Sequence, residues 1–186
     1  PFATMFLGDM GAEVIKIEKP KGGDGARTMG LPMPMLGPKD SEYYVALNRN
    51  KQGVVIDLAN PEGAALARRL AALSDVVVEN FRPGVMDRLG LGYKALAEIN
   101  PGLVYCAISG FGQTGPDALN PAYDQIIQGL SGEMAVNGDE RLNPLRAGFP
   151  VCDTVGGLNA AFAVMAALFH RQRTGEGQSI DLMAKA

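Results

Sequence analysis

Strand-like and helix-like segments alternate along the chain, and this order constrains its fold more than any other feature. The run Val76–Val78 is apolar on both faces, which suits a central strand of a parallel sheet. A helix is predicted from about Val85 to Ile99, and the next strand at Leu103–Ile108. Repetition of this order predicts an α/β fold, in which an open parallel sheet carries helices on both faces.

The first part of the chain shows the same alternation. Glu13–Glu18 is a short strand-like run, and a second strand is predicted at Val54–Leu58. Between them, residues 20–40 are rich in Gly and Pro and are predicted to form a surface excursion. Asn60 and Pro61 are typical of a helix start, and that helix is predicted to bury one face, formed by Leu66, Leu70 and Leu73.

The order changes after the strand at Leu103–Ile108. A Gly/Pro-rich loop precedes a helix predicted near Asp124–Met134, and a long apolar helix follows from about Thr154 to His170. The chain ends within a predicted strand, Gln178–Met183, so we expect it to be part of a longer protein.

Composition excludes several classes of function. A formal net charge of −3 gives no general electrostatic reason to bind nucleic acid or an anionic membrane, and no uninterrupted apolar run reaches about 18 residues. Cys106 and Cys152 lack metal-ligand spacing and have only His170 for company, so neither a metal site nor a disulfide is predicted. We expect a soluble, cytoplasmic protein.

The loop Gly110–Gly115 matches the G-x-G-x-x-G pattern of dinucleotide-binding sites. Such a site needs a helix that opens at the loop, so that its first amides meet the pyrophosphate. Pro116 and Pro121 oppose an immediate helix here. A nicotinamide or flavin site is therefore disfavoured, although the glycines would let the backbone approach a ligand.

The segment Glu79–Gly84 follows the predicted strand Val76–Val78, where open α/β sheets place their ligands. Asn80 and Gly84 could simply shape the turn into the next helix. Arg88 favours a binding role, because its guanidinium could meet a phosphate while Phe81 offers an apolar face to a base. Lys19, at the end of another predicted strand, could add a second positive charge.

Asp153 comes just before the long apolar helix, where an aspartate most often serves as an N-cap. Gly156 and Gly157 then fall in the predicted first turn, where each glycine costs about 1 kcal/mol relative to alanine. A carboxylate beside glycines could instead be a nucleophile that forms an acyl anhydride or a thioester. Both interpretations remain open on the residues alone.

Together these segments resemble the class III coenzyme A transferases, also called the CaiB/BaiF family. The shared segments, in order, are Leu7–Glu18, Leu47–Lys51, Glu79–Gly84, Gly110–Pro116, Pro121–Asp124, Asp153 and Arg173–Gln178. The resemblance implies that residues 1–186 are part of a Rossmann-like large domain, without its first strand and the C-terminal small domain. It also implies that the full-length protein forms an interlocked homodimer.

In that family the aspartate matching Asp153 is the nucleophile, and acyl-CoA and free carboxylic acids are the substrates, with no metal or tightly bound cofactor. The resemblance places Tyr123 near the reacting thioester. It implies that the CoA nucleotide is bound by Lys19, Ile56, Asn80, Phe81 and Arg88. One departure is Ala59, where relatives often carry a lysine near the CoA phosphates.

Two other functions are compatible with these features. An α-methylacyl-CoA racemase on the same fold needs a histidine base at the position of Tyr123, and tyrosine is a poor base at neutral pH. A non-catalytic CoA-binding module would have no use for the nucleophile Asp153. The transferase is therefore preferred.

Overall fold

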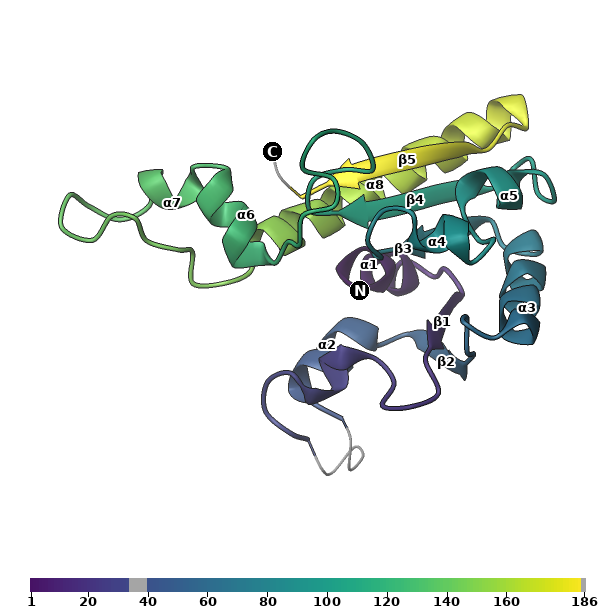
Figure 1. The fold of residues 1–186 in the computed structure, drawn as a ribbon, viewed down its shortest axis with the longest axis horizontal. Helices are drawn as coiled ribbons and strands as arrows, with labels where there is room; N and C mark the ends of the chain where they lie inside the picture. Colours follow the sequence, from purple (N-terminus) through teal and green to yellow (C-terminus); the bar gives the residue numbers. More distant parts are fainter. Residues whose placement is uncertain (34–39, 185–186) are drawn as a thin grey trace. The chain divides into compact units, whose positions relative to one another are not determined.

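The computed structural model describes residues 1–33 and 40–184 and divides into two compact units. Unit 1 comprises Pro1–Leu70 and unit 2 comprises Ala71–Ala186. Helix α3 (Pro61–Ala72) runs across the boundary. Figure 1 follows the chain from the purple elements of unit 1 to the yellow elements at the C-terminal end of unit 2.

Unit 1 is built on two parallel strands, β1 (Val14–Glu18) and β2 (Lys51–Val55), paired from Val14 with Lys51 to Glu18 with Val55. Its helices are α1 (Phe2–Asp9), the 3₁₀ turn η1 (Gly25–Thr28) and α2 (Glu42–Asn48). The α2 helix begins at Ser41, whose buried hydroxyl accepts the Tyr44 N–H. Both strands therefore end at the same edge of this small sheet.

Charged side chains hold the turn after β1 in place. Glu18, buried at the end of β1, accepts two hydrogen bonds from the Arg27 guanidinium, at 2.8 and 2.9 Å. The Tyr44 hydroxyl donates to the same carboxylate at 2.6 Å, and Arg27 lies 3.9 Å from the centre of the Tyr44 ring. Arg27 also pairs with Asp40. This network links η1 and α2 to the end of β1.

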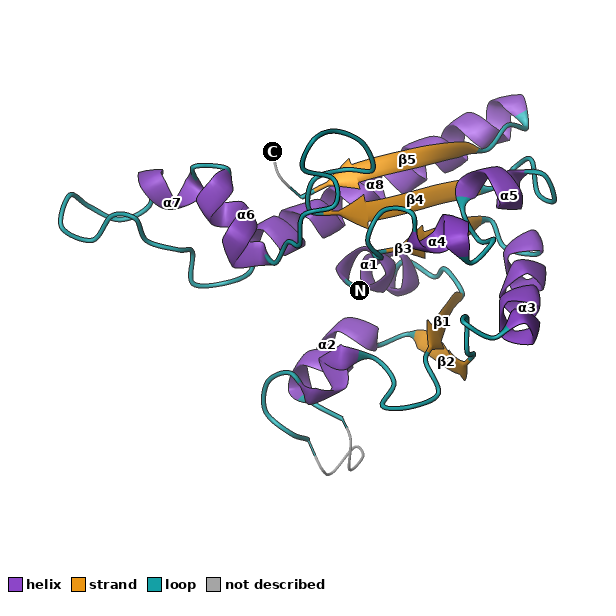
Figure 2. Ribbon diagram, in the orientation of Figure 1, coloured by secondary structure: helices purple, strands orange, loops and turns teal. Residues whose placement is uncertain are grey.

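Unit 2 contains a three-stranded parallel sheet with the order β3–β4–β5. Its strands are β3 (Val76–Glu79), β4 (Val104–Ser109) and β5 (Gln178–Met183). Short helices α4 (Val85–Arg88) and α5 (Tyr93–Ala97) connect β3 to β4, and α6 (Asp124–Leu130), α7 (Glu133–Val136) and α8 (Val151–Thr174) connect β4 to β5. Figure 2 shows α8 running along the sheet.

Helices α5 and α8 pack on opposite faces of this sheet. The rings of Tyr93 on α5 and Tyr105 on β4 lie 6.0 Å apart. Gly156 of α8 faces Leu182 of β5, which pairs with Ile108 of β4. Because alternate side chains of a strand point to opposite faces, Tyr105 and Ile108 mark the two faces. The predicted parallel α/β fold with helices on both faces is confirmed in this unit.

The long helix α8 carries apolar residues at both its buried and its exposed positions, and these residues differ in size. Its buried positions carry small residues, Gly156, Gly157, Ala160, Val164 and Ala167. Its larger apolar side chains, such as Leu158 and Phe162, are exposed. By length and composition, α8 is the one helix of the described residues that could cross a membrane. A helix that packs on a sheet passes the same test, so the expectation of no membrane partner stays a prediction.

Several predicted elements differ from the observed ones. The strand expected at Val54–Leu58 is β2, three residues earlier, because Lys51–Val55 pairs with β1. The helix expected over Val85–Ile99 is two short helices, since Gly90 adopts a positive φ of 68° between them. The helix expected near Asp124–Met134 is likewise divided, at Gly132.

The predicted burial also needs correction in two places. β4, rather than the Val76–Val78 strand, is central in its sheet and nearly all buried. Leu66 of α3 and Leu73, which follows this helix, are exposed, and the buried positions of α3 are the small residues Ala67 and Ala71. The predicted α3 cap is confirmed, since Asn60 Oδ1 accepts the Glu62 N–H at 2.9 Å.

Candidate functional site

Asp153 is the third residue of α8 and does not cap it. The helix begins at Val151, three residues earlier than the sequence predicts, and Pro150 occupies the N-cap position. The N-cap interpretation of Asp153 is therefore wrong, and Gly156 and Gly157 lie beyond the first turn. Within the described residues, no hydrogen bond or ion pair engages the Asp153 carboxylate, and this side chain is exposed.

A second carboxylate lies beside the start of α8. Asp124, the first residue of α6, is buried, and its Oδ1 accepts the backbone N–H of Asp153 at 3.0 Å. Desolvation raises the pKa of Asp153 above its ordinary value, and the neighbouring Asp124 charge raises it further. The surroundings of Asp153 therefore disfavour its anionic form.

Tyr123 is brought close to this pair by chain connectivity. It is the N-cap residue of α6, directly before Asp124, and its side chain is exposed. A Cβ added to Gly110 would lie 2.1 Å from the Ala122 Cβ, so only glycine lets the loop after β4 come this close to the segment before α6. The structure therefore gathers Tyr123 and Asp153 in one region of unit 2.

Asn80, Phe81 and Arg88 lie at the carboxyl end of β3 or shortly after it. Asn80 Nδ2 donates to the Ile108 carbonyl at 2.7 Å, which ties the exit of β3 to β4. The Phe81 N–H donates to Glu79 at 2.7 Å, and the Phe81 ring is exposed. Arg88 ends α4, whose N-cap Gly84 has a φ of 79°, and its guanidinium forms no ion pair among the described residues.

Lys19 and Ile56 lie in unit 1, and the structure brings them to the same edge of its sheet. Lys19 is exposed directly after β1, and the Ile56 N–H donates to the Glu18 carbonyl at 3.0 Å. The Ile56 side chain is buried against the first turn of α3, where a Cβ at Gly63 would lie 3.3 Å from it. The roles of both residues in nucleotide binding stay predictions.

Three buried polar residues of unit 2 had no predicted role: Gln128, Asp124 and Glu79. Asp124 and Gln128 share one face of a helix at i, i+4 spacing, and this spacing between an acid and an amide was the available signal. Glu79 ends β3, where burial raises its pKa. Within the described residues its carboxylate accepts hydrogen bonds from the Phe81 N–H and, at 3.5 Å, from the Tyr105 hydroxyl.

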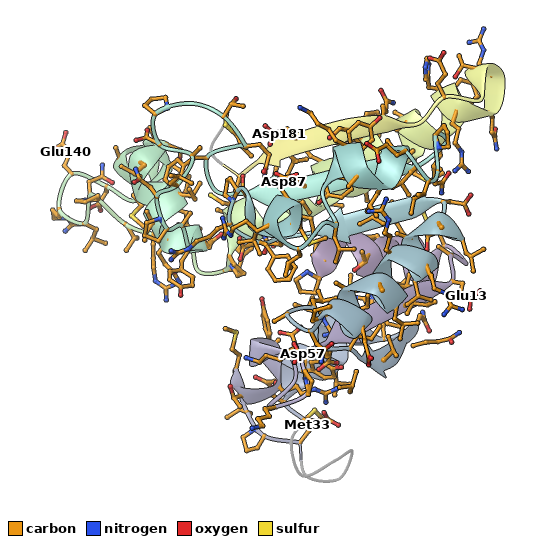
Figure 3. All side chains as sticks on the ribbon, turned by 45° about the vertical axis from the view of Figure 1, so that its right-hand side comes forward. Glu13, Met33, Asp57, Asp87, Glu140 and Asp181 are labelled. Carbon is orange, nitrogen blue, oxygen red and sulfur yellow. The ribbon has the colours of Figure 1, made fainter. Side chains whose placement is uncertain are left out.

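The loop Gly110–Gly115 follows β4, as predicted, and no helix opens at it. The next helix, α6, begins only at Asp124. The Gln113 N–H donates to Asp181 of β5 at 2.9 Å, and Figure 3 labels Asp181 on that strand. The loop therefore lacks the helix that a dinucleotide site requires. Across the part of the chain that the structure describes, no three His, Cys, Asp or Glu side chains gather as a metal site would need.

Comparisons with known proteins show which family and which solved structures this chain is similar to. The model of CoA-transferase family III matches residues 1–185. The chain is 47% identical to the succinate–glutarate CoA-transferase of Agrobacterium fabrum, over 98% of this chain and 46% of that protein. It is 45% identical to the acetyl-CoA:oxalate CoA-transferase of Acetobacter aceti, with the same coverage of 98% and 46%.

Among solved structures, a CaiB/BaiF family protein from Brucella suis superposes with a TM-score of 0.95 at 43% identity. That match covers 99% of this chain and 49% of the other. The chain thus spans about half the length of the relatives it matches.

Proposed function

The chain belongs to CoA-transferase family III, and from that premise we propose that its complete gene product moves coenzyme A from an acyl-CoA donor to a free carboxylic acid. The observation that carries the proposal is the state of Asp153. Its carboxylate is exposed at the start of α8, accepts no hydrogen bond among the described residues and lies beside a second carboxylate.

The reaction begins when an Asp153 oxygen attacks the thioester carbonyl. The new C–O bond forms an aspartyl acyl anhydride, and the C–S bond breaks to release CoA thiolate. The thiolate then attacks the aspartyl carbonyl, which gives an aspartyl-CoA thioester and frees the donor acid. The acceptor carboxylate attacks this thioester, and the returning thiolate cleaves the second anhydride to form the new acyl-CoA and regenerate Asp153.

The proposed substrates are acyl-CoA and a small carboxylic acid, with a dicarboxylate as the first acceptor to test. The names of the two relatives include glutarate and oxalate, both dicarboxylates. Coenzyme A itself is the group transferred, so the proposed chemistry needs no resident cofactor. We propose that Asn80, Phe81 and Arg88 contact the nucleotide end of CoA and that Tyr123 lies near its thioester.

The test separates the nucleophile from a structural aspartate. In Asp153→Asn an amide replaces the attacking carboxylate, so we expect transfer to fall by about 10³-fold or more. The melting temperature should stay near that of the wild type, because the hydrogen bond from residue 153 to Asp124 uses the backbone N–H, which the substitution keeps. The control is Asp139→Asn, at an exposed aspartate of unit 2, which should keep full activity.

Covalent labelling completes the test. Wild-type enzyme incubated with acyl-CoA and then treated with hydroxylamine or borohydride should show modification at Asp153 by mass spectrometry, and Asp153→Asn should show none. Transfer by Asp153→Asn at the wild-type rate would eliminate this mechanism.

A further inference from the structure

The two buried polar side chains of α6 hold the segment that leads into α8. Gln128 is fully buried, and its Nε2 donates to Asp124 Oδ2. Gln128 Oε1 accepts the Ala147 N–H at 2.9 Å, while Asp124 Oδ1 accepts the Asp153 N–H at 3.0 Å. The chain from Ala147 to Asp153 is therefore fixed at both ends by one pair of side chains.

This arrangement replaces an ordinary helix cap. The first N–H groups of a helix have no partner within it, and Pro150 at the N-cap of α8 supplies no side-chain acceptor. Asp124 supplies one from another helix, to the residue that carries the proposed nucleophile. Because the bond is made to the Asp153 backbone, it fixes the Cα position of Asp153 and leaves its carboxylate free to react.

The pair also places a negative charge next to Asp153. No ion pair neutralises Asp124 within the described residues, and its charge contributes to the raised pKa of Asp153. Acylation or thioester formation converts Asp153 from an anion to a neutral group. The repulsion between the two carboxylates then disappears, so Asp124 favours the covalent forms of Asp153 over the free carboxylate.

We propose that Asp124 and Gln128 are a positioning pair for the reaction: they fix the backbone of Asp153 and shift its equilibrium from the free carboxylate toward the covalent intermediates. This inference rests on the proposed function. It assigns the two residues no contact with substrate, and their effect passes through Asp153.

The hydrogen-bond pattern allows a test by exchange of the two groups. In Asp124→Asn, the new amide faces the Gln128 amide, so either the bond between them or the bond to Ala147 is lost. In Gln128→Glu, two buried carboxylates face each other. The double variant Asp124→Asn/Gln128→Glu restores every donor and acceptor except the long 3.4 Å contact from Gln128 to the Phe149 carbonyl. It also moves the charge to a side chain that does not contact Asp153.

Each variant of the complete gene product is measured for kcat, for donor KM, for melting and for the steady-state fraction of aspartyl-CoA thioester after acid quench. We expect both single variants to lose about 10- to 100-fold in kcat with little change in KM, since misplacement of a reacting group acts on the chemical step. The double variant should recover most of the lost kcat and melt like the wild type. Its thioester fraction should nevertheless remain at least about threefold below wild type, because the charge beside Asp153 is gone.

The control is Asp117→Asn, at an exposed aspartate of unit 2, which should leave all four measurements unchanged. Wild-type kcat and thioester fraction in Asp124→Asn would overturn the inference. So would parallel losses of kcat and melting with no rescue in the double variant, which indicate a structural role alone. If Asp124→Asn does not fold, the double variant decides by its thioester fraction. Absence of any Asp153 adduct in the wild type would instead reject the proposed function itself.

Discussion

Two parallel strands of this protein end in a buried glutamate, and the two glutamates have opposite surroundings. Glu18 ends β1 in unit 1, and the Arg27 guanidinium that binds it lowers its pKa to about 2. Glu79 ends β3 in unit 2, where burial raises its pKa, because no cation is paired with it in the described residues. The same residue type at the same place in a strand is stabilised as an anion in one unit and destabilised in the other.

The contrast extends to other carboxylates of the two units. In unit 1, Asp24 pairs with Lys16 at 2.5 Å, and the pKa of Asp24 is lowered. In unit 2, the pKa of Asp153 is raised, and Asp124 beside it has no cation in the described part of the chain. Glu18 and Asp24 thus stabilise the fold of unit 1, whereas no ion pair engages Glu79 or Asp153 in the described residues, which suits the nucleophile proposed at Asp153.

Removal of the guanidinium from unit 1 should have the largest effect on this contrast. Arg27→Met leaves Glu18 buried without its counterion and removes the bonds to Tyr44 and Asp40. Breaking a largely buried pair is costly, so we expect a loss of about 3 kcal/mol in the free energy of unfolding, measured with urea. The glutamate would then resemble Glu79 in having no cation.

The matched control is Arg141→Met in unit 2. Arg141 pairs with Asp139 at 3.1 Å, but its side chain is 86% exposed. An exposed pair contributes little, so unfolding should change by less than about 0.5 kcal/mol. Equal losses in the two variants would mean that the network around Glu18 gives unit 1 no special stability.

Arg88 is a cation of unit 2 at the carboxyl side of β3, and no carboxylate pairs with it in the described residues, so it is available for a ligand. Arg88→Ala should weaken CoA binding by about 1.5–3 kcal/mol through loss of a charge-assisted phosphate contact. Calorimetry with CoA measures the change, and Arg173→Ala, at the other end of unit 2, serves as control. Pantetheine thioesters, which lack the nucleotide, should bind both variants like the wild type. If Arg88→Ala weakens the binding of pantetheine thioesters as much as that of CoA, Arg88 does not act through the nucleotide.

Exchange of each strand-end glutamate for glutamine should give results of opposite sign. Glu18→Gln replaces an anion that Arg27 stabilises, and we expect a loss of about 1–2 kcal/mol in unfolding free energy at pH 7. Glu79→Gln replaces an anion without a cation and keeps an acceptor for the Phe81 N–H, so we expect a change of less than about 1 kcal/mol, in the stabilising direction.

The pH dependence of these variants provides a second check. The lowered pKa of Glu18 means that its stabilisation is complete above its ordinary value of 4.5 and is lost as the pH falls toward about 2. The difference between wild type and Glu18→Gln should therefore shrink as urea unfolding is repeated toward pH 3. Glu79 has a raised pKa, so its destabilising effect is relieved as the pH falls. A gap for Glu18→Gln that widens in acid would contradict the assigned ion pair.

Much of the fold could be predicted from local sequence signals. The Asn60 cap, the strand Gln178–Met183 and the alternation that gives a parallel sheet were all readable, because each depends on residues close together in the chain. The start of β2 could not be predicted from local signals. Lys51–Gly53 has no apolar strand pattern and becomes a strand through its pairing with β1, so tertiary pairing overrides local preference there.

The residues of the candidate site were proposed from the sequence, and their roles stay predictions. Asp153 was named from the residues around it and Tyr123 from the family resemblance, but their interactions were predictable only in part. The bond from Asp124 to Asp153 joins residues 29 positions apart, and no periodicity connects them. The start of α8 at Val151 was missed for the same reason, since its cap is a side chain of another helix.

The smallest expected effect concerns Gly156. Its substitution tests whether unit 2 keeps space free near Asp153, the carboxylate that has no ion pair in the described residues. A Cβ added there would meet only the Leu182 Cδ2, at 3.8 Å, which is an ordinary contact. Alanine is preferred over glycine in a helix by about 1 kcal/mol, so Gly156→Ala should raise the free energy of unfolding by about 0.5–1 kcal/mol. Thermal and urea unfolding measure this gain.

Measurement of KM for acyl-CoA then distinguishes a role of Gly156 in substrate binding from a role in packing. If substrate uses the space beside the second turn of α8, Gly156→Ala should be more stable than the wild type and yet have a higher KM for acyl-CoA. Ala160→Gly, at a buried position one turn further along the same helix, should lower stability and leave KM unchanged. A Gly156→Ala enzyme with wild-type KM would show that the glycine serves close packing of α8 on the sheet, and that Asp153 reacts without the space that its neighbouring glycines suggested.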